Sequence, residues 1–301
     1  MDHKRVIYVC GPTAAGKTAV AITIAQELAC EIISFDSRQF YKELQIGAAP
    51  PNTNELAAAK HHFIGHLRVN DEWSAGQFAK AAEQKISELH ESYNDVILVG
   101  GSGLYMKALS EGFDEMPEIP VHFREELNAE WQEHGIEKLQ QELKQKDPEY
   151  FEKVDQQNPQ RLIRALEVIR HSGDTFTAVR KGHAQKEHSY TEVKIGITLP
   201  RPELYERINL RVDKMMEAGL PEEVKSLIPH KHMNALQTVG YKELFSHFEG
   251  ELSLDEAVEE IKKNSRRYAK RQLTWFRRDD EIKWFSPFET EAILTHLYER
   301  A

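Results

Sequence analysis

The chain has 301 residues, 40% of them hydrophobic and 29% charged, and a formal net charge of −10. This length allows one large α/β domain or a core with an insertion. The negative charge argues against indiscriminate nucleic-acid binding but permits a local basic surface. No apolar run is long enough to cross a membrane, the first expected strand leaves no room for a signal peptide, and two cysteines form no disulfide framework, so we expect a cytoplasmic protein without a membrane span.

The first expected element is a strand at residues 6–10, followed at once by Gly-Pro-Thr-Ala-Ala-Gly-Lys-Thr. This string matches the G-x-x-x-x-G-K-[ST] phosphate loop, and a helix is expected to begin near Lys17. Backbone N–H groups in such a loop point at the anion, Lys17 adds a mobile charge, and the Thr18 hydroxyl can bind magnesium. The predicted diphosphate-binding residues are Gly11, Pro12, Thr13, Ala14, Ala15, Gly16, Lys17 and Thr18.

Further strands and helices alternate through the first third of the chain. Residues 30–35 and 95–99 are expected strands, and residues 74–89 are an expected amphipathic helix with Ser74 as its N-cap. This alternation predicts a parallel sheet with helices on its faces. Ligands of such sheets bind at the carboxyl ends of the strands, so we expect Asp36, residues 100–102 and the phosphate loop to converge.

The pattern changes after about residue 120. Residues 121–188 are helical in pattern, with a helix expected at 160–172, and strand character returns at 193–199. We therefore predict a P-loop NTPase-like α/β core with an inserted all-helical domain. The predicted boundaries are residues 1–117 and 189–301 for the core, whose C-terminal part is helical, and residues 118–188 for the insertion.

Asp36 and Ser102 are candidate functional residues at two strand ends. A carboxylate beside a phosphate site is costly unless it binds a metal or handles a proton, although a turn aspartate satisfied by backbone N–H groups is an equal alternative. Ser102 could donate a hydrogen bond to a phosphate oxygen, or could simply be a turn serine.

Two basic segments could contact phosphates. Gln160-Arg161-Leu162-Ile163-Arg164 begins a helix with two arginines that could clamp a phosphate or remain solvated. Residues 262–278 hold eight basic residues and no acidic one, with aromatic residues interleaved. This second segment predicts RNA binding by phosphate contacts and base stacking, and a solvated amphipathic helix whose aromatics enter the core is the alternative.

The phosphate loop lacks the partners of a nucleotide hydrolase. The strand at 95–99 ends in Gly-Gly-Ser rather than in an aspartate, and the GTPase strings Asp-x-x-Gly and Asn-Lys-x-Asp are missing. Three interpretations stay open. They are an ATP-dependent kinase of a nucleoside or small metabolite, a transferase whose diphosphate is the leaving group, and an RNA-binding protein with a vestigial nucleotide site.

Six strings together resemble the tRNA dimethylallyltransferases, also called tRNA isopentenyltransferases. They run in order over nearly the whole chain, from residue 11 to residue 277. The strings are Gly-Pro-Thr-Ala-Ala-Gly-Lys-Thr (11–18), Asp-Ser-x-Gln-x-Tyr (36–41), Gly-Gly-Ser-Gly-Leu-Tyr (100–105), Asn-Pro-Gln-Arg-Leu-Ile-Arg-Ala-Leu-Glu-Val (158–168), Val-Gly-Tyr-Lys-Glu-Leu (239–244) and Lys-Arg-Gln-Leu-Thr-Trp-Phe-Arg (270–277).

The resemblance implies transfer of a dimethylallyl group from dimethylallyl diphosphate to N6 of the adenosine 3′-adjacent to the tRNA anticodon, with Mg²⁺ as cofactor. It implies that Asp36 is the general base and that Ser102 and Arg124 stabilise the departing diphosphate. The partners are then the tRNA anticodon stem-loop and the prenyl donor, with no membrane, and we expect a monomer. The implied tRNA-contacting residues are Asp36, Ser37, Arg38, Gln39, Gln160, Arg161, Leu162, Ile163, Arg164, Gln237, Thr238, Val239, Gly240, Tyr241, Lys242, Lys270, Arg271, Gln272, Leu273, Thr274, Trp275, Phe276 and Arg277.

The sequence departs from the family pattern at three places. Residues 44–51 replace Met-Asp-Ile-Gly-Thr-Ala-Lys-Pro with Leu-Gln-Ile-Gly-Ala-Ala-Pro-Pro, and Gly65 stands where an aspartate is usual. Ser102 replaces a usual threonine. We assign no role to residues 45–51 or to Gly65 from the sequence.

Overall fold

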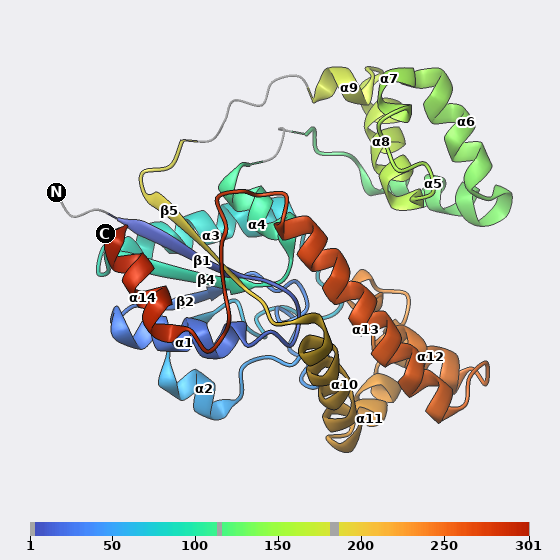
Figure 1. Cartoon of the computed structure of the whole chain (residues 1–301). Helices are drawn as coiled ribbons and strands as arrows, with labels where there is room; N and C mark the ends of the chain where they lie inside the picture. Colours follow the sequence, from blue (N-terminus) through green and yellow to red (C-terminus); the bar gives the residue numbers. More distant parts are fainter. Residues whose placement is uncertain (1–3, 113–115, 181–186, 301) are drawn as a thin grey trace. The chain divides into compact units, whose positions relative to one another are not determined.

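The computed structural model describes residues 4–112, 116–180 and 187–300 (Figure 1). The chain divides into two compact units: Met1–Ser110 with Glu187–Ala301, and Glu111–Lys186. Each unit has its own core of buried apolar residues. Within the described residues, no helix is both long and apolar enough to cross a membrane.

The first unit is built on a parallel sheet of six described strands in the order β3-β2-β4-β1-β5-β6. This confirms the parallel sheet predicted from the alternating pattern. All residues of β1 and β4 are buried, which explains their continuous apolar runs. The strands are β1 (Arg5–Cys10), β2 (Ile32–Ser34), β3 (His61–His62), β4 (Asp95–Gly100), β5 (Thr191–Ile197) and β6 (Lys283–Phe285).

Helices cover both faces of this sheet. On one face α3 and α4 contribute Phe78 and Leu109 to a core that also contains residues of α11, α12 and α13. On the other face α1 and α14 contribute Val20 and Leu297. The helices of this unit are α1 (Lys17–Glu27), α2 (Thr53–Ala58), α3 (Ala75–His90), α4 (Gly103–Ser110), α10 (Arg201–Glu217), α11 (Leu220–Ser226), α12 (Tyr241–Phe248), α13 (Leu254–Phe276) and α14 (Thr290–Glu299), with short 3₁₀ turns at Ile228–His230 and Asn234–Leu236.

The second unit contains only helices among its described residues. Gly135, with φ of +78°, ends one helix before the next begins, as its place in the sequence predicted. The Asn158 side chain caps the helix that starts at Pro159. The helices are α5 (Val121–His134), α6 (Ile136–Lys146), α7 (Pro148–Phe151), α8 (Pro159–Ser172) and α9 (Phe176–Val179).

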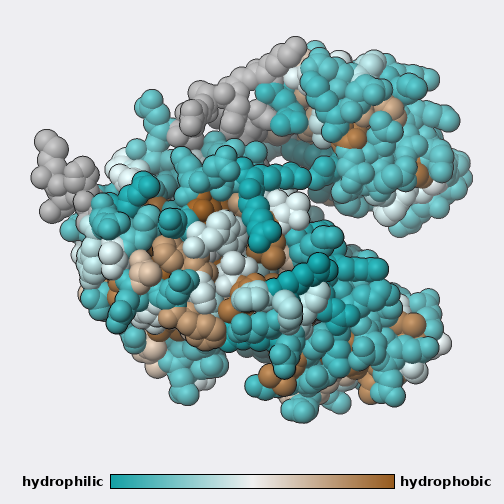
Figure 2. Space-filling view, viewed as in Figure 1, coloured by the Kyte–Doolittle hydropathy of each residue, from teal (hydrophilic) through white to brown (hydrophobic). Residues whose placement is uncertain are grey.

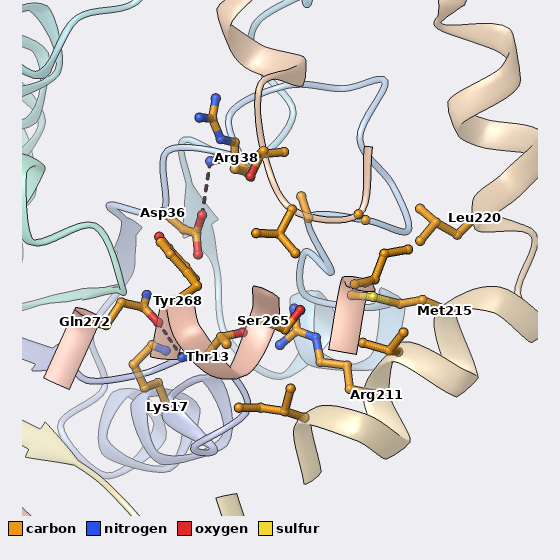
Figure 3. Close-up of a pocket in the computed structure, with 18 residues that line it drawn as sticks. Thr13, Lys17, Asp36, Arg38, Arg211, Met215, Leu220, Ser265, Tyr268 and Gln272 are labelled. Atoms are coloured by element: carbon orange, nitrogen blue, oxygen red, sulfur yellow. Dashed lines mark hydrogen bonds between the residues drawn. The ribbon is translucent and has the colours of Figure 1, made fainter. Parts of the chain in front are cut away.

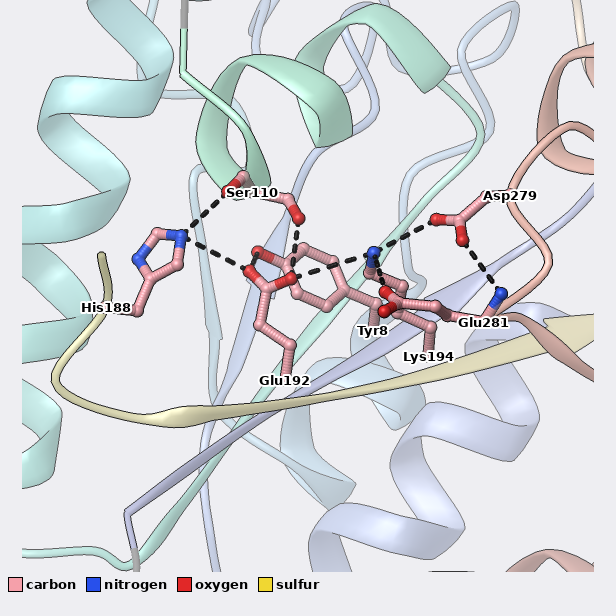
Figure 4. A network of polar contacts seen from close by, with 7 residues as sticks. All are labelled: Tyr8, Ser110, His188, Glu192, Lys194, Asp279 and Glu281. Carbon is pink, nitrogen blue, oxygen red and sulfur yellow. Dashed lines mark hydrogen bonds and ion pairs between the residues drawn. The ribbon is translucent and has the colours of Figure 1, made fainter. Parts of the chain in front are cut away.

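The chain leaves the first unit after Ser110 and re-enters it at Glu187, and a polar network connects these two places (Figure 4). Glu192 on β5 accepts hydrogen bonds from Tyr8 Oη at 2.9 Å and from Ser110 Oγ at 2.5 Å. The His188 ring contacts the Ser110 carbonyl oxygen through Nε2 at 2.8 Å. Lys194, in turn, contacts Asp279 at 3.0 Å and Glu281 at 2.7 Å. The network therefore holds Ser110 and His188 side by side.

The surface of each unit is mainly polar on the face that Figure 2 shows. Hydrophilic residues cover most of that face, and hydrophobic residues are confined to smaller areas among them. Both cysteines, Cys10 and Cys30, are buried and unpaired.

Candidate active site

The phosphate loop follows β1 and takes a conformation that depends on its glycines. Gly11 has φ of +140°, and a Cβ atom there would lie 2.2 Å from the carbonyl oxygen of Ile197. Gly16 has φ of +95° and immediately precedes α1. Lys17 folds back over the loop, where its Nζ donates to the Pro12 carbonyl oxygen at 2.8 Å. The loop thus presents the N-terminus of α1 at the carboxyl edge of the sheet.

Asp36 follows β2 and lies in a tight turn. Its backbone N–H donates to Ser34 Oγ at 3.2 Å, and its Oδ1 accepts from the backbone N–H of Arg38 at 3.1 Å. The turn interpretation of this residue is therefore correct for its local geometry. The same carboxylate also lines a pocket together with Lys17, which leaves it able to act on a ligand.

Ser102 follows β4 and fixes the turn that carries Asp36. Its Oγ accepts from the Ser37 backbone N–H at 3.0 Å and donates to Ser37 Oγ at 3.1 Å. Ser102 is buried, with 9% of its surface exposed. The predicted convergence of three strand ends is thus observed, with Ser102 bonded to the residue beside Asp36.

Gln272 on α13 ties the phosphate loop to the end of β4. Its Oε1 accepts from the Thr13 backbone N–H at 2.9 Å, and its Nε2 donates to the Gly101 carbonyl oxygen at 2.8 Å. A Cβ atom at Gly101 would lie 2.3 Å from this Nε2. The sequence placed Gln272 among the tRNA contacts, whereas its buried side chain positions the loop.

Asp95, the only acid of β4, lies at the opposite edge of the sheet. Arg5 Nε donates to its Oδ1 at 2.6 Å, and both side chains are buried. The register pairs Arg5 with Asp95 at the start of both strands, while Cys10 pairs with Gly100 at their carboxyl ends. Asp95 therefore cannot serve the phosphate loop as the metal-binding aspartate of a hydrolase does.

The pocket beside the phosphate loop has a polar side and an apolar side (Figure 3). Lys17, Thr13 and Asp36 lie on the polar side, and Met215 and Leu220 lie across from them. The residues that line it are Thr13, Lys17, Asp36, Arg38, Gly47, Ala48, Ile208, Arg211, Val212, Met215, Leu220, Thr238, Val239, Gly240, Ile261, Ser265, Tyr268 and Gln272.

Two cations of the pocket are held in a desolvated setting. Burial lowers the pKa of Lys17 to about 8, although the Asp36 carboxylate acts in the opposite direction. Burial also lowers the pKa of Arg211, again against the effect of Asp36. An anionic ligand would stabilise the charged forms of both groups, because its negative charge would compensate for the hydration that they lose by burial.

Sequence reasoning missed two arginines of α10, Arg207 and Arg211. Arg207 Nη1 is buried and has no hydrogen-bond partner in the described part of the chain. It lies 3.9 Å from the position of a Cβ atom at Gly16, so it is next to the phosphate loop. Their spacing of four residues could have indicated one basic helix face, but nothing local linked that helix to the loop.

The segments expected to contact tRNA have buried and exposed members. A surface groove is lined by five residues of α13 and by Arg278, which follows that helix; the five are Arg267, Lys270, Arg271, Thr274 and Trp275. One face of each helix in these segments packs on a core, so the side chains of that face do not reach the surface. The buried members are Leu162, Ile163, Gly240, Tyr241, Gln272 and Phe276.

Arg124 lies in the second unit and pairs with a buried glutamate there. Its Nε and Nη2 both contact Glu167 at 2.7 Å, and Arg164 contacts the same carboxylate at 2.5 Å. Burial alone would raise the pKa of Glu167, but hydrogen bonds from the two arginines outweigh it and lower that pKa. The roles expected for Arg124 and Arg164 stay predictions.

The parallel sheet, the phosphate loop after its central strand and the ligand pocket at the carboxyl edge define a P-loop NTPase-like protein. The family model described as IPP transferase matches residues 39–279. A tRNA dimethylallyltransferase of Christiangramia forsetii is 50% identical over 93% of this chain and 92% of that protein. One of Flavobacterium johnsoniae is 48% identical over 94% and 93%. The chain therefore belongs to the tRNA dimethylallyltransferase family.

Solved structures agree with this assignment. The tRNA isopentenylpyrophosphate transferase of Bacillus halodurans is 35% identical, with a TM-score of 0.72 over 99% of this chain and 96% of that one. The corresponding enzyme of Staphylococcus epidermidis is 32% identical, with a TM-score of 0.70 over 99% and 100%. A eukaryotic dimethylallyltransferase shares the fold at 23% identity, with a TM-score of 0.79 over 99% of this chain and 77% of that one.

Proposed function

We propose that this protein transfers a dimethylallyl group from dimethylallyl diphosphate to N6 of the adenosine 3′-adjacent to the anticodon of tRNA, releasing diphosphate. The observation that carries this proposal is the pocket of Figure 3. One carboxylate and a phosphate-loop lysine face an apolar side in the same pocket, as a prenyl diphosphate and an attacking amine require.

The reaction would form one bond and break one. The N6–C1 bond forms as the C1–O bond of the donor breaks, and the bonding electrons leave with the diphosphate. The proton that N6 loses passes to the Asp36 carboxylate, which acts as the general base. The loop N–H groups, Lys17 and Arg211 stabilise the charge that develops on the leaving group.

The apolar side of the pocket would hold the hydrocarbon part of the donor. Ile208, Val212 and Met215 come from α10, and Leu220 and Ile261 come from α11 and α13. These side chains offer no hydrogen bond, so an apolar group is the favoured occupant. Outside this lining, the buried Nη1 of Arg207 lies next to Gly16 and favours an anion bound at the phosphate loop.

Magnesium would be held mainly by the diphosphate and water. Among the described residues, no group of three or more His, Cys, Asp or Glu could hold a metal ion. Mg²⁺ in phosphate sites commonly takes only one or two protein oxygens, and the Thr18 hydroxyl in the first turn of α1 fits that need. When bound, the ion would neutralise part of the diphosphate charge.

The groove on α13 would contact the tRNA backbone. Four of its six lining residues are basic, and Trp275 offers a stacking surface. The target adenosine would have to leave the anticodon stack to reach Asp36 in the pocket. We propose that the protein acts as a monomer in the cytoplasm, where its tRNA substrate is available.

A transfer assay tests this function. Labelled dimethylallyl diphosphate and unmodified tRNA are incubated with the protein, and labelled ATP is supplied in a parallel reaction. The proposal expects the prenyl label in tRNA and no phosphate transfer from ATP. Phosphate transfer would favour a kinase, and tRNA binding without turnover would favour an RNA-binding protein.

A further inference from the structure

Glu223 on α11 makes an unusual set of contacts with residues 45–47, a segment that is distant in the sequence. Its Oε2 accepts from the backbone N–H groups of Gln45 at 2.8 Å and Ile46 at 2.7 Å. Its Oε1 accepts from the Gly47 backbone N–H at 3.0 Å and from Tyr241 Oη at 2.6 Å. One carboxylate thus binds three consecutive N–H groups and a phenol.

These contacts leave the segment little freedom to move. Hydrogen bonds to an ionised acceptor are stronger than neutral ones, and four of them converge on Glu223. Tyr241 is fully buried, and a Cβ atom at Gly47 would lie 2.5 Å from its ring. The backbone of residues 45–47 is therefore held against α11 by hydrogen bonds and against α12 by close packing.

This held segment forms part of the apolar side of the pocket. Gly47 and Ala48 line the pocket, as does Leu220, which lies one helical turn from Glu223. Ile46 Cδ1 lies 4.0 Å from the position of a Cβ atom at Gly219, the residue before Leu220. Figure 3 shows Leu220 across the pocket from Asp36 and Lys17. Glu223 therefore supports the wall of the pocket against which the end of a hydrocarbon chain would lie.

We propose that Glu223 is a positioning residue that sets the length of the prenyl chain the pocket accepts. This inference rests on the proposed function. On this proposal a five-carbon group occupies the apolar side as it stands, whereas a ten-carbon group would need this wall to recede. The wall cannot recede without breaking the hydrogen bonds at Glu223, so the longer donor is rejected.

Glu223→Gln tests the inference, with Glu222→Gln as its matched control. Glu222 is the exposed neighbour on the same helix, so its substitution removes an equal charge without touching the segment. Each variant is given dimethylallyl diphosphate and geranyl diphosphate in competition, with the same tRNA. We expect the preference for the five-carbon donor to fall by about tenfold or more in Glu223→Gln and to stay unchanged in Glu222→Gln.

Tyr241→Phe provides a second test, since it removes only one of the four hydrogen bonds. We expect the preference for the five-carbon donor to fall in this variant too, but by less. If Glu223→Gln does not fold, the Tyr241→Phe result alone decides whether the inference holds. A preference equal to that of Glu222→Gln in every folded variant overturns the inference while the proposed function stands. Absence of transfer from both donors by the unmodified protein overturns both.

Discussion

Asp36 is held in its turn by its own neighbours and faces the pocket that contains Lys17. The bond from its backbone N–H to Ser34 Oγ fixes the turn, and the bond from the Arg38 N–H orients the carboxylate. Its charge acts on two cations of the pocket, because Asp36 raises the pKa of Lys17 and of Arg211 against the lowering effect of burial. A carboxylate that shares a pocket with the phosphate-loop lysine is suited to the role of general base that we propose for it.

We predict that Asp36→Ala abolishes prenyl transfer and leaves tRNA affinity within about twofold of the unmodified protein. The expected loss in kcat is at least roughly a hundredfold, because general bases contribute about that much or more. Single-turnover transfer and filter binding measure the two quantities. Retained turnover would rule Asp36 out as the base.

Lys17 gives a pH dependence of diphosphate binding. Its pKa in the protein is lowered to about 8, mainly by burial, with Asp36 opposing and Arg211 adding to the shift. Above that pH the free protein loses the ammonium charge, so a bound diphosphate must recruit a proton. We therefore expect the dissociation constant for inorganic diphosphate to rise between pH 8 and 9.5, by up to about tenfold per pH unit.

Lys17→Met is the reference for this titration, because it retains the ionisation of the ligand and of the other groups. Its affinity should be weaker at every pH and closer to that of the unmodified protein at high pH. Calorimetric titration of both proteins gives the comparison. Parallel pH profiles for the two proteins would contradict a titrating Lys17.

Helix α13 has two different faces, one packed in the core and one exposed to solvent. Its buried face includes Ile261, Gln272 and Phe276, and Gln272 holds the phosphate loop. Its outer face lines the basic groove from Arg267 onward. The lysines near the middle of the helix are different, since Lys262 contacts Asp213 at 2.8 Å. Only the C-terminal half of the helix therefore presents the groove.

We predict that Arg267→Gln combined with Arg271→Gln weakens tRNA binding and flattens its salt dependence. Each lost phosphate contact should reduce the slope of log affinity against log salt by about 0.7 to 0.9. Lys262→Gln serves as the control, because its ammonium is already engaged by Asp213 and Glu259. An unchanged slope in the double variant would mean that the groove does not contact phosphates.

At the scale of the whole molecule, the second unit is an insertion whose attachment points lie together. Ser110 and His188 are in contact through the network around Glu192, and each unit has its own core. The pocket of Figure 3 is lined by residues of the first unit alone. Donor binding and tRNA engagement should therefore be separable.

We predict that replacing residues 112–186 with a short Gly-Ser linker leaves a first unit that folds and binds inorganic diphosphate. Transfer to tRNA should fall severely, since the candidate contacts at 160–164 and Arg124 are removed. Thermal unfolding with and without diphosphate measures the first property, and the transfer assay measures the second. If the shortened protein did not fold, or if it transferred the prenyl group undiminished, the proposed separation of donor binding from tRNA engagement would be wrong.

Much of the core could be predicted from local sequence, because buried parallel strands read as continuous apolar runs. The phosphate loop and Asp36 were found since each lies at the end of such a strand. The two-residue strand β3 was missed because it is too short to show a pattern. The Glu223 contacts could not be found, since they join residues more than 170 positions apart whose proximity only the fold creates.

The position of the added group in the tRNA tests the proposed function most directly. After reaction with dimethylallyl diphosphate, the tRNA is digested and its anticodon-loop fragments are analysed by tandem mass spectrometry. We expect one added dimethylallyl group on N6 of the adenosine 3′-adjacent to the anticodon, and none with Asp36→Ala. A dimethylallyl group at another base, or added phosphate in place of it, would show that the proposed function is wrong.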